Sequence, residues 1–435
     1  MKNSDIAFLV YQPERARRKN NSFDGNDNVG AKVIIDVLSK NGVSVDFCSV
    51  ASAHKYKLVL LSLTSTYDCI AFYKAVALRQ DWSPAKRKFI VIGGGFGMQN
   101  PTVLRKHIDY AVFGRGEDII YPLVSAVLGG SNSYEHESVM HLPDIYSVKI
   151  QQAKRLYDSD VFKEGFVGCG NMCKFCHYSW VRKRMHNANY GENGKIGETY
   201  VQGTLTNNNS PEMLFKDIPK ITKKYGRIRT ALDGFSERLR FTYGKKITDK
   251  EIKANVEYLG EFEKTTVLII YNIGNMPSET QDDRDSLYGT LCDVKPKNRV
   301  IAIIHTTPFR ASLATPLQYA EVQLNPSMSD LRFKTIVDTP TFLSKHSMSN
   351  ESNFSQLQTT IIERATEGTD ALFHTMCFSS KIKNNIAAKK IRLLSNNFDL
   401  KPYLRRYHPD EEKHPGWFLN TYIQTKTLGK IFLKT

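Results

Sequence analysis

The chain has 435 residues, a length that allows two or three domains with sizeable cores. No run of the sequence approaches the roughly 18 to 20 consecutive apolar residues of a membrane span, which argues against a membrane protein. The 60 Lys and Arg residues exceed the 44 Asp and Glu residues, and the net charge of +16 either favours a polyanionic partner such as nucleic acid or only solvates a large surface.

Seven cysteines are too sparse for a disulfide framework, and we find no signal peptide. Free thiols survive best in a reducing compartment. We therefore expect a cytoplasmic protein that has no membrane partner.

Short apolar runs alternate with helical segments over the first 130 residues. We predict strands at residues 6–11, 43–47, 58–63, 88–92 and 110–113, and helices at 30–40, 67–79 and after residues 114–117. This alternation is typical of βαβ units around a parallel sheet. The fold class expected for residues 1–130 is therefore α/β, with a doubly wound, Rossmann-like parallel sheet.

Small or flexible residues follow several of these strands. A parallel sheet binds its ligands at the carboxyl ends of its strands, where such residues let a ligand approach the backbone. The candidate cofactor-binding residues of this first domain are Thr64, Ser65, Gly93, Gly94, Gly114 and Glu117. Glycine-rich turns after strands also occur for reasons of topology alone.

A polar linker is expected at residues 131–160, followed by a second α/β domain at 161–325. There we predict a strand before Cys169, an irregular segment at 187–209, helices at 211–225, 247–262 and 282–291, and strands at 227–232, 265–272 and 299–305. Such alternation favours a partial (β/α) barrel with its chemistry at the strand carboxyl ends. Residues 326–435 form a small α+β extension that caps the barrel, recognises substrate or completes the core.

Three cysteines stand close together at the start of the second domain. Cys169, Cys173 and Cys176 form a C-x3-C-x2-C motif, one thiolate short of the four that close a [4Fe-4S] cluster, so one iron would keep an open coordination position. Structural zinc needs four closed ligands, and the other cysteines form no second pair, while His177 is poorly placed beside Cys176. We therefore favour an iron–sulfur cluster over zinc.

This motif, with Phe175 before the last cysteine, resembles that of the radical S-adenosylmethionine (radical SAM) enzymes. Residues 231–240 (ALDGFSERLR) with 246–252, residues 271–283 and residues 307–319 are similar to motifs of the subfamily with an N-terminal cobalamin-binding-like domain. The resemblance implies that SAM binds the open iron through its methionine moiety and that an electron donor such as flavodoxin or ferredoxin reduces the cluster. It also implies that SAM is cleaved to a 5′-deoxyadenosyl radical.

The resemblance also implies roles for individual residues. Ser236 would contact the methionine carboxylate, and Glu237 the ribose diol or the amino group. The lesser alternative for Glu237 is a salt bridge with Arg238 or Arg240. Gly274 would shape the loop behind the adenine, and Phe175 would contact the cofactor. The Gly-Gly-Glu motif of the family is missing, and residues 202–204 are its nearest counterpart.

The first domain is similar to a cobalamin-binding domain but lacks its D-x-H-x-x-G signature. Two interpretations stay open, a cobalamin-binding domain and a Rossmann-like domain without the cofactor. With cobalamin, we expect methylation of an unactivated carbon; without it, rearrangement, oxidation or ring formation are open. A methylthiotransferase is disfavoured because the first domain holds only Cys48 and Cys69.

The sequence says less about the substrate. Arg182, Lys183 and Arg184 follow the cysteines, with Tyr178 and Trp180 nearby, and this combination grips phosphates and stacks on bases, or forms a solvated face. We predict a radical SAM enzyme that functionalises a C–H bond, with nucleic acid or a nucleotide among the candidate substrates. The alternative is a non-catalytic iron–sulfur protein that binds nucleic acid or senses redox state.

Overall fold

The computed structural model describes residues 4–10, 29–131, 134–159, 166–169, 171–186, 215–220, 226–324, 335–348, 353–378, 387–412, 414–421, 423 and 425–435. The irregular segment expected at 187–209, which includes 202–204, and most of the helix expected at 211–225 lie outside these residues; within the latter, Phe215–Lys220 is a 3-10 helix. No helix in the described part of the chain is long and apolar enough to cross a membrane.

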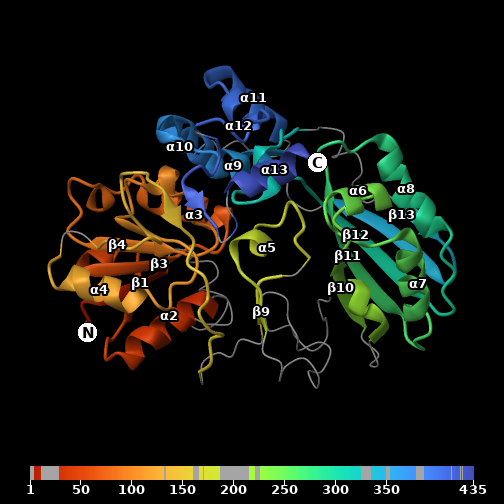
Figure 1. Cartoon of the computed structure of the whole chain (residues 1–435), viewed down its shortest axis with the longest axis horizontal. Helices are drawn as coiled ribbons and strands as arrows, with labels where there is room; N and C mark the ends of the chain where they lie inside the picture. The colour runs from red at the N-terminus through yellow and green to blue at the C-terminus, as the bar shows by residue number, and fades with distance from the viewer. Residues whose placement is uncertain are drawn as a thin grey trace.

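The described strands are β1 (Ile6–Val10), β2 (Asp46–Ser49), β3 (Leu58–Ser62), β4 (Ile90–Gly94), β5 (Tyr110–Val112), β6 (Val139–His141), β7 (Val148–Lys149), β8 (Phe166–Val167), β9 (Met185–His186), β10 (Arg227–Ala231), β11 (Thr266–Gly274), β12 (Val300–Pro308), β13 (Thr335–Asp338), β14 (Phe342–Met348) and β15 (Leu419–Asn420). The helices are α2 (Val29–Lys40), α3 (Thr66–Val76), α4 (Ile120–Leu128), α5 (His177–Val181), α6 (Glu237–Thr242), α7 (Asp249–Leu259), α8 (Gln281–Cys292), α9 (Asn353–Glu363), α10 (Asp370–Phe378), α11 (Ala387–Asn397), α12 (Lys401–Leu404) and α13 (Thr425–Leu433). Two sheets organise them (Figure 1).

The first sheet has the order β2-β1-β3-β4-β5-β6, and its first five strands are parallel, as the sequence predicts. Its central strands are buried runs of apolar residues because helices cover both faces. Helices α2 and α4 pack on one face and α3 on the other. The order 2-1-3-4-5 is the flavodoxin-like doubly wound arrangement, whose ligands bind where the strand order reverses, between β1 and β3.

The segment expected to be a linker contributes to this sheet. Strand β6 lies within residues 131–160 and pairs antiparallel with β5, and β7 pairs with β15 near the C-terminus. Gly114 forms a further bridge with Gln151. The sequence concealed these strands because they are two or three residues long and lie among Ser, Asn, His and charged residues. Residues 131–160 are therefore structured in the described part and not a plain linker.

The second sheet has the order β10-β11-β12-β14-β13, with four parallel strands and β13 antiparallel at one edge. Helices α7 and α8 pack on one face, where alternate residues of the strands are buried. Strands β13 and β14 of this sheet lie beyond residue 325, where the sequence analysis placed the end of the domain. Strand β8 pairs with β9 in a separate ribbon.

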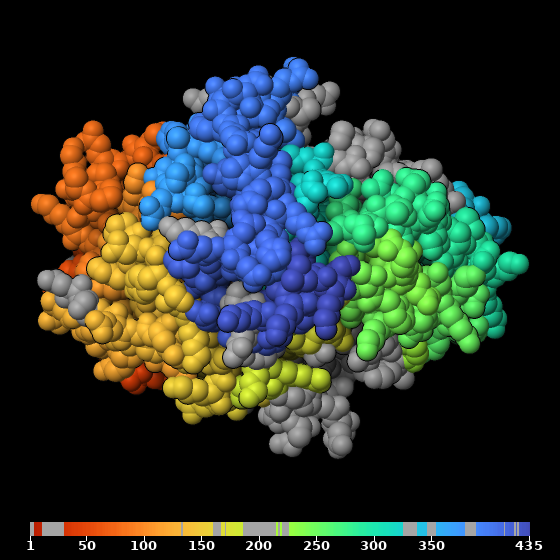
Figure 2. Space-filling view, turned by 45° about the horizontal axis from the view of Figure 1, so that its top comes forward, coloured from red at the N-terminus to blue at the C-terminus, as the bar shows by residue number. Residues whose placement is uncertain are grey.

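The C-terminal segment completes a core. Helices α9 and α10 contact α3, and their apolar residues join one buried cluster with the first sheet. Tyr73 packs on Phe373 at 4.7 Å between ring centroids, and Arg105 pairs with Asp370 at 2.8 Å. Figure 2 shows this segment (blue) between the N-terminal part (orange) and the second sheet (green). These contacts support the expected role of completing the core, and the other two roles stay predictions.

The turn after β4 packs closely against the loop after β3. Gly97 donates its N–H to Leu63 O at 2.7 Å, and Leu63 donates to Gly94 O at 2.8 Å. A Cβ atom on Gly97 would lie 2.2 Å from the backbone oxygen of Ser65. Backbone atoms cannot move aside easily, so this position requires glycine.

We expect Gly97→Ala to lower the free energy of unfolding by about 1–3 kcal/mol, because the new methyl group overlaps backbone atoms. Chemical denaturation followed by circular dichroism measures this change. The control is Gly289→Ala in α8, where a Cβ atom meets nothing within 4 Å, and there we expect equal or slightly greater stability. Equal stabilities of the Gly97→Ala variant and the wild type would contradict the assignment.

Candidate functional site

The three cysteines lie on one short loop between β8 and α5. Gly168 has a φ of 74° and Met172 a φ of 50°, and both positive values turn the chain tightly around the cysteines. The loop closes on itself through a hydrogen bond from Cys176 N to Cys173 O at 3.0 Å. Trp180 anchors it by donating its indole N–H to Cys173 O at 2.8 Å. The turn therefore presents all three side chains from a few consecutive residues.

The three thiols interact electrostatically with one another. Burial raises the pKa of Cys173 to about 12 and also raises that of Cys176. Thiols in such a setting are protonated at neutral pH, and a bound metal would displace the protons to obtain thiolate ligands. The loop thus holds potential ligands that a metal centre would stabilise as thiolates.

Three thiols on one loop suit a cubane cluster. In the described residues, no group of three or more His, Cys, Asp or Glu side chains meets the spacing that a single metal ion needs. The ligands of a [4Fe-4S] cluster do not need that spacing, because each thiolate binds a different iron atom. The donor set of Cys169, Cys173 and Cys176 is therefore compatible with such a cluster.

The cysteine loop makes hydrogen bonds to Tyr243, which lies between the segments 231–240 and 246–252, and to the segment 307–319. Lys174 donates its backbone N–H to Tyr243 O at 2.9 Å and accepts at its carbonyl from Leu317 N at 3.2 Å. The ring of His177 donates from Nδ1 to Leu313 O at 2.6 Å. The hydroxyl group of Tyr243 donates to Pro277 O, which belongs to the segment 271–283. Segments that are distant in the sequence thus converge on the cysteine loop.

One apolar cluster contains residues from all four motif segments. It combines the buried residues Trp180, Leu239, Tyr243, Met276, Phe309, Leu317 and Tyr319, and Met172 and Phe175 pack against it. Phe175 is half-buried here, next to the cysteine that it precedes. The cysteine loop, with α5 after it, lies between the two sheets (Figure 1).

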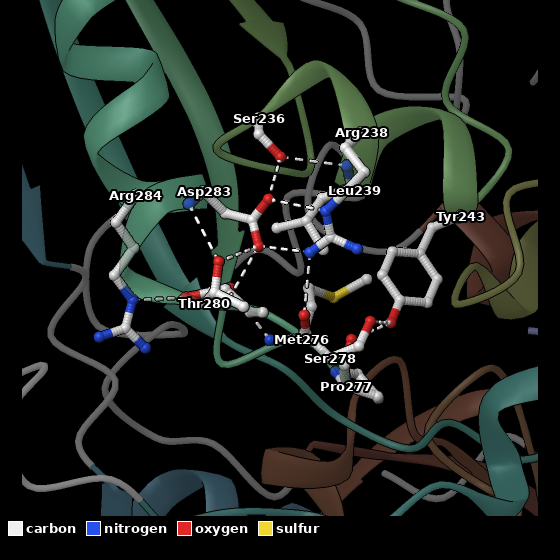
Figure 3. Close-up of polar contacts among 11 residues, drawn as sticks. Ser236, Arg238, Leu239, Tyr243, Met276, Pro277, Ser278, Thr280, Asp283 and Arg284 are labelled. Atoms are coloured by element: carbon white, nitrogen blue, oxygen red, sulfur yellow. Dashed lines mark hydrogen bonds and ion pairs between the residues drawn. The ribbon is translucent and has the colours of Figure 1, made fainter.

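A network around Asp283 fixes the start of α6 and α8 (Figure 3). The carboxylate of Asp283 accepts from Ser236 Oγ at 2.5 Å, from Thr280 N at 2.8 Å and from Arg238 at 2.5 Å. Burial alone would raise the pKa of Asp283, but the hydrogen bonds from Arg238, Ser236 and Thr280 lower it well below the usual range of a carboxyl group. Asp283 is therefore ionised and holds the two helix starts together.

The residues expected to bind SAM also have structural partners. The Ser236 hydroxyl caps α6 by accepting from Leu239 N at 3.1 Å, and it also donates to Asp283. Glu237 accepts from Asp249 N at 2.8 Å, a contact that differs from the salt bridge with an arginine that we considered. Gly274 ends β11 and accepts from Phe309 N at 2.7 Å. A role in SAM binding stays a prediction for all three.

The candidate residues of the first sheet likewise have internal partners. Thr64 and Ser65 donate their N–H groups to Asp68 at 2.8 and 2.9 Å in the cap of α3. A Cβ atom on Gly93 would lie 2.2 Å from the side chain of Met98, and Gly94 O accepts from Leu63 N. Around the β5 end, a Cβ atom on Gly114 would lie 2.3 Å from Gln151 O, and Glu117 pairs with Arg115 at 2.5 Å. Cofactor binding by these residues stays a prediction.

Phe96 connects the first sheet to the cysteine loop, and sequence reasoning missed it. Its ring lies 5.4 Å from that of His177 and 6.0 Å from that of Tyr178, and the Arg182 guanidinium lies 4.5 Å from its centroid. Trp180 is 4% exposed. Arg182, Tyr178 and Trp180, which we considered for contact with nucleic acid, thus contribute to internal packing. An aromatic residue within the glycine-rich turn was the available signal.

Glu363 is a second residue without a sequence signal. It is 4% exposed and accepts from Leu313 N at 3.1 Å. Burial raises the pKa of Glu363 from its ordinary value of 4.5 to about 7, although the cations of Arg310 and Arg364 and the Leu313 N–H act in the opposite direction. Because Leu313 O also binds His177, this carboxyl group supports the wall of the cysteine loop from α9.

No protein-family model matches the chain, and no curated protein matches its sequence. Solved structures of a cobalamin-dependent S-adenosylmethionine radical enzyme, OxsB, do align with it. The form with aqua-cobalamin bound aligns at 12% identity over 66% of this chain and 51% of that chain, with a TM-score of 0.45. The form with aqua-cobalamin and S-adenosylmethionine aligns at 13% identity over 90% and 70% of the two chains, with a TM-score of 0.44.

The chain thus spans about half the length of the first of these structures. Both structures are of the family whose motifs the sequence resembles.

We expect Glu363→Gln to remove a pH dependence of stability. The native protein binds a proton at Glu363 that the unfolded chain has lost between pH 4.5 and about 7, so the wild type loses stability as the pH rises through this range. The variant should therefore gain up to about 3 kcal/mol over the wild type at pH 8 relative to pH 4. Melting temperatures at several pH values measure the difference. Glu367→Gln, at an exposed position, is the control, and equal pH profiles of wild type and Glu363→Gln would contradict this account.

Proposed function

We propose that the chain is a radical SAM enzyme that holds a [4Fe-4S] cluster through Cys169, Cys173 and Cys176. The observation that supports this most strongly is that the other three motif segments pack with the cysteine loop in one apolar cluster, beside the hydrogen bonds at Lys174 and His177. A chance C-x3-C-x2-C spacing would not require the other three segments to lie beside it. This packing supports the proposal that the four segments form one site.

A [4Fe-4S] cluster with one open iron would bind SAM and supply the electron that cleaves it to methionine and a 5′-deoxyadenosyl radical. The three cysteines would each bind one iron through a thiolate, and the residues packed around the loop would keep water from the cluster. Cys173 and Trp180 are only 5% and 4% exposed, so solvent has little access to this part of the loop. The radical would abstract hydrogen from an unactivated carbon of the substrate, and flavodoxin or ferredoxin would supply the electron.

The second sheet would form the partial (β/α) barrel expected of this family. Four parallel strands with α7 and α8 outside support it. SAM would lie near Ser236, Glu237, Gly274 and Phe175. Ser236 and Glu237 also accept hydrogen bonds from the backbone of α6 and α7. Nucleic acid and nucleotides stay among the substrates to test because of the net charge of +16.

The first sheet is the proposed cobalamin site. Its flavodoxin-like strand order favours a ligand site at the carboxyl ends of β1 and β3, and the turn after β4 contacts α5 through Phe96. A corrinoid bound at this edge would lie beside the cysteine loop, where methyl transfer to a substrate carbon is the expected outcome. The visible spectrum of protein purified from cobalamin-supplemented cells tests this, and a spectrum without corrinoid bands favours a domain that lacks the cofactor.

We expect the anaerobically reconstituted wild type to hold about four irons per chain and to form 5′-deoxyadenosine from SAM and dithionite. Alanine at Cys169, Cys173 or Cys176 should reduce both readouts to background, because each thiolate binds one iron. Cys292→Ala is the control, since this cysteine is exposed at the end of α8. Iron analysis and chromatography of the nucleosides measure the two readouts.

A cluster that is reduced without forming 5′-deoxyadenosine would contradict the proposed enzyme. That result would favour the alternative of a redox-sensing or nucleic-acid-binding protein. Full iron content in the three alanine variants would instead contradict the ligand assignment.

A further inference from the structure

A buried ion pair lies next to the cysteine loop, and the function proposed above does not use it. Lys245 Nζ and Asp233 Oδ2 are 2.6 Å apart, and their side chains are 13% and 15% exposed. Asp233 follows the carboxyl end of β10, and Lys245 follows α6. Burying two charges costs free energy that the pair recovers only in part, so a buried pair often serves a purpose other than stability.

Backbone contacts hold the segment before Lys245 against the cysteine loop. Tyr243 O accepts from Lys174 N at 2.9 Å, directly before Lys245 in the chain. A Cβ atom on Gly244, which has a φ of 83°, would lie 3.3 Å from Met172 O and 3.5 Å from the Cα atom of Cys173. The backbone of residues 243 and 244 thus lies against the loop, directly before Lys245 in the chain.

The pair also interacts electrostatically with the thiols. The Lys245 ammonium favours the thiolate of Cys173, and the Asp233 carboxylate opposes the thiolates of Cys173 and Cys176. Lys245 and Asp233 are held together as an ion pair, so both charges lie beside the cysteine loop. In this poorly solvated site a unit charge acts over longer distances than at the surface.

We propose that Lys245, positioned by Asp233, raises the reduction potential of the cluster held by Cys169, Cys173 and Cys176. This inference rests on the proposed function, since it requires a cluster at these cysteines. Reduction adds one electron to a cluster that already carries three thiolates, so a fixed cation stabilises the reduced form and a fixed anion destabilises it. Lys245 therefore makes the cluster easier to reduce, and Asp233 acts in the opposite direction while it holds the lysine in place.

The two charges predict shifts of opposite sign. Lys245→Met removes the cation and should lower the midpoint potential, whereas Asp233→Asn removes the anion and should raise it. Asparagine tolerates the φ of 55° at position 233, so this second change preserves the backbone. Lys245→Arg keeps the charge and should restore a potential close to that of the wild type.

The experiment is a redox titration of the anaerobically reconstituted full chain, followed by the paramagnetic signal of the reduced cluster in the absence of SAM. Lys253→Met is the matched control, because Lys253 pairs with Asp293 at 2.7 Å on the exposed side of α7, and its potential should equal that of the wild type. A loss of structure alone would not shift the two variants in opposite directions.

Equal potentials of wild type, Lys245→Met and Asp233→Asn would overturn the inference, as would shifts of the two variants in the same direction. If Lys245→Met fails to assemble a cluster, Asp233→Asn decides, since an upward shift supports the inference and an unchanged potential refutes it. A wild type that assembles no cluster refutes the proposed function itself, an outcome that iron analysis separates from an unchanged potential.

Discussion

The backbone of Lys174 is the point on which the arrangement of the candidate site depends. Its N–H group donates to Tyr243 O, directly after α6, and its carbonyl group accepts from Leu317 N, which follows β12 in the chain. These two hydrogen bonds hold the cysteine loop against α6 and against the segment 307–319 at once. The loop has only the short strand β8 before it and the five-residue helix α5 after it, so its own secondary structure could not fix it.

The same constraint connects the loop to both halves of the molecule. Leu313 O binds His177 and Leu313 N binds Glu363 of α9, so the C-terminal segment supports the loop from behind. Phe96 brings the glycine-rich turn of the first sheet against α5. A ligand at the carboxyl edge of the first sheet and a cluster at the cysteines would consequently be neighbours, as a reaction that involves both cofactors requires.

Much of the fold follows from the sequence, because buried parallel strands are continuous apolar runs. β1, β3, β4 and β11 lie within a few residues of their predicted bounds. The short strands β6 and β7 and the late strands β13 and β14 escaped prediction. Their pairing is set by distant partners, which local patterns do not contain.

Only part of the candidate site could be predicted from the sequence. The cysteines stand out because ligand spacing within one loop is a local property. Phe96, Glu363 and the pair of Lys245 and Asp233 were not predicted, because only the folded chain brings them to the loop. Ser236 was assigned to SAM, and the structure gives its hydroxyl two internal partners, since serine at a helix start is also the common cap.

With Cys169, Cys173 and Cys176 as its ligands, the proposed cluster would keep one iron open for SAM. The most direct measurement is the electron paramagnetic resonance spectrum of the reduced, reconstituted protein with and without SAM whose methionine carboxylate carries a magnetic isotope. The account predicts a changed line shape and hyperfine coupling to the label. Identical spectra without such coupling would contradict it.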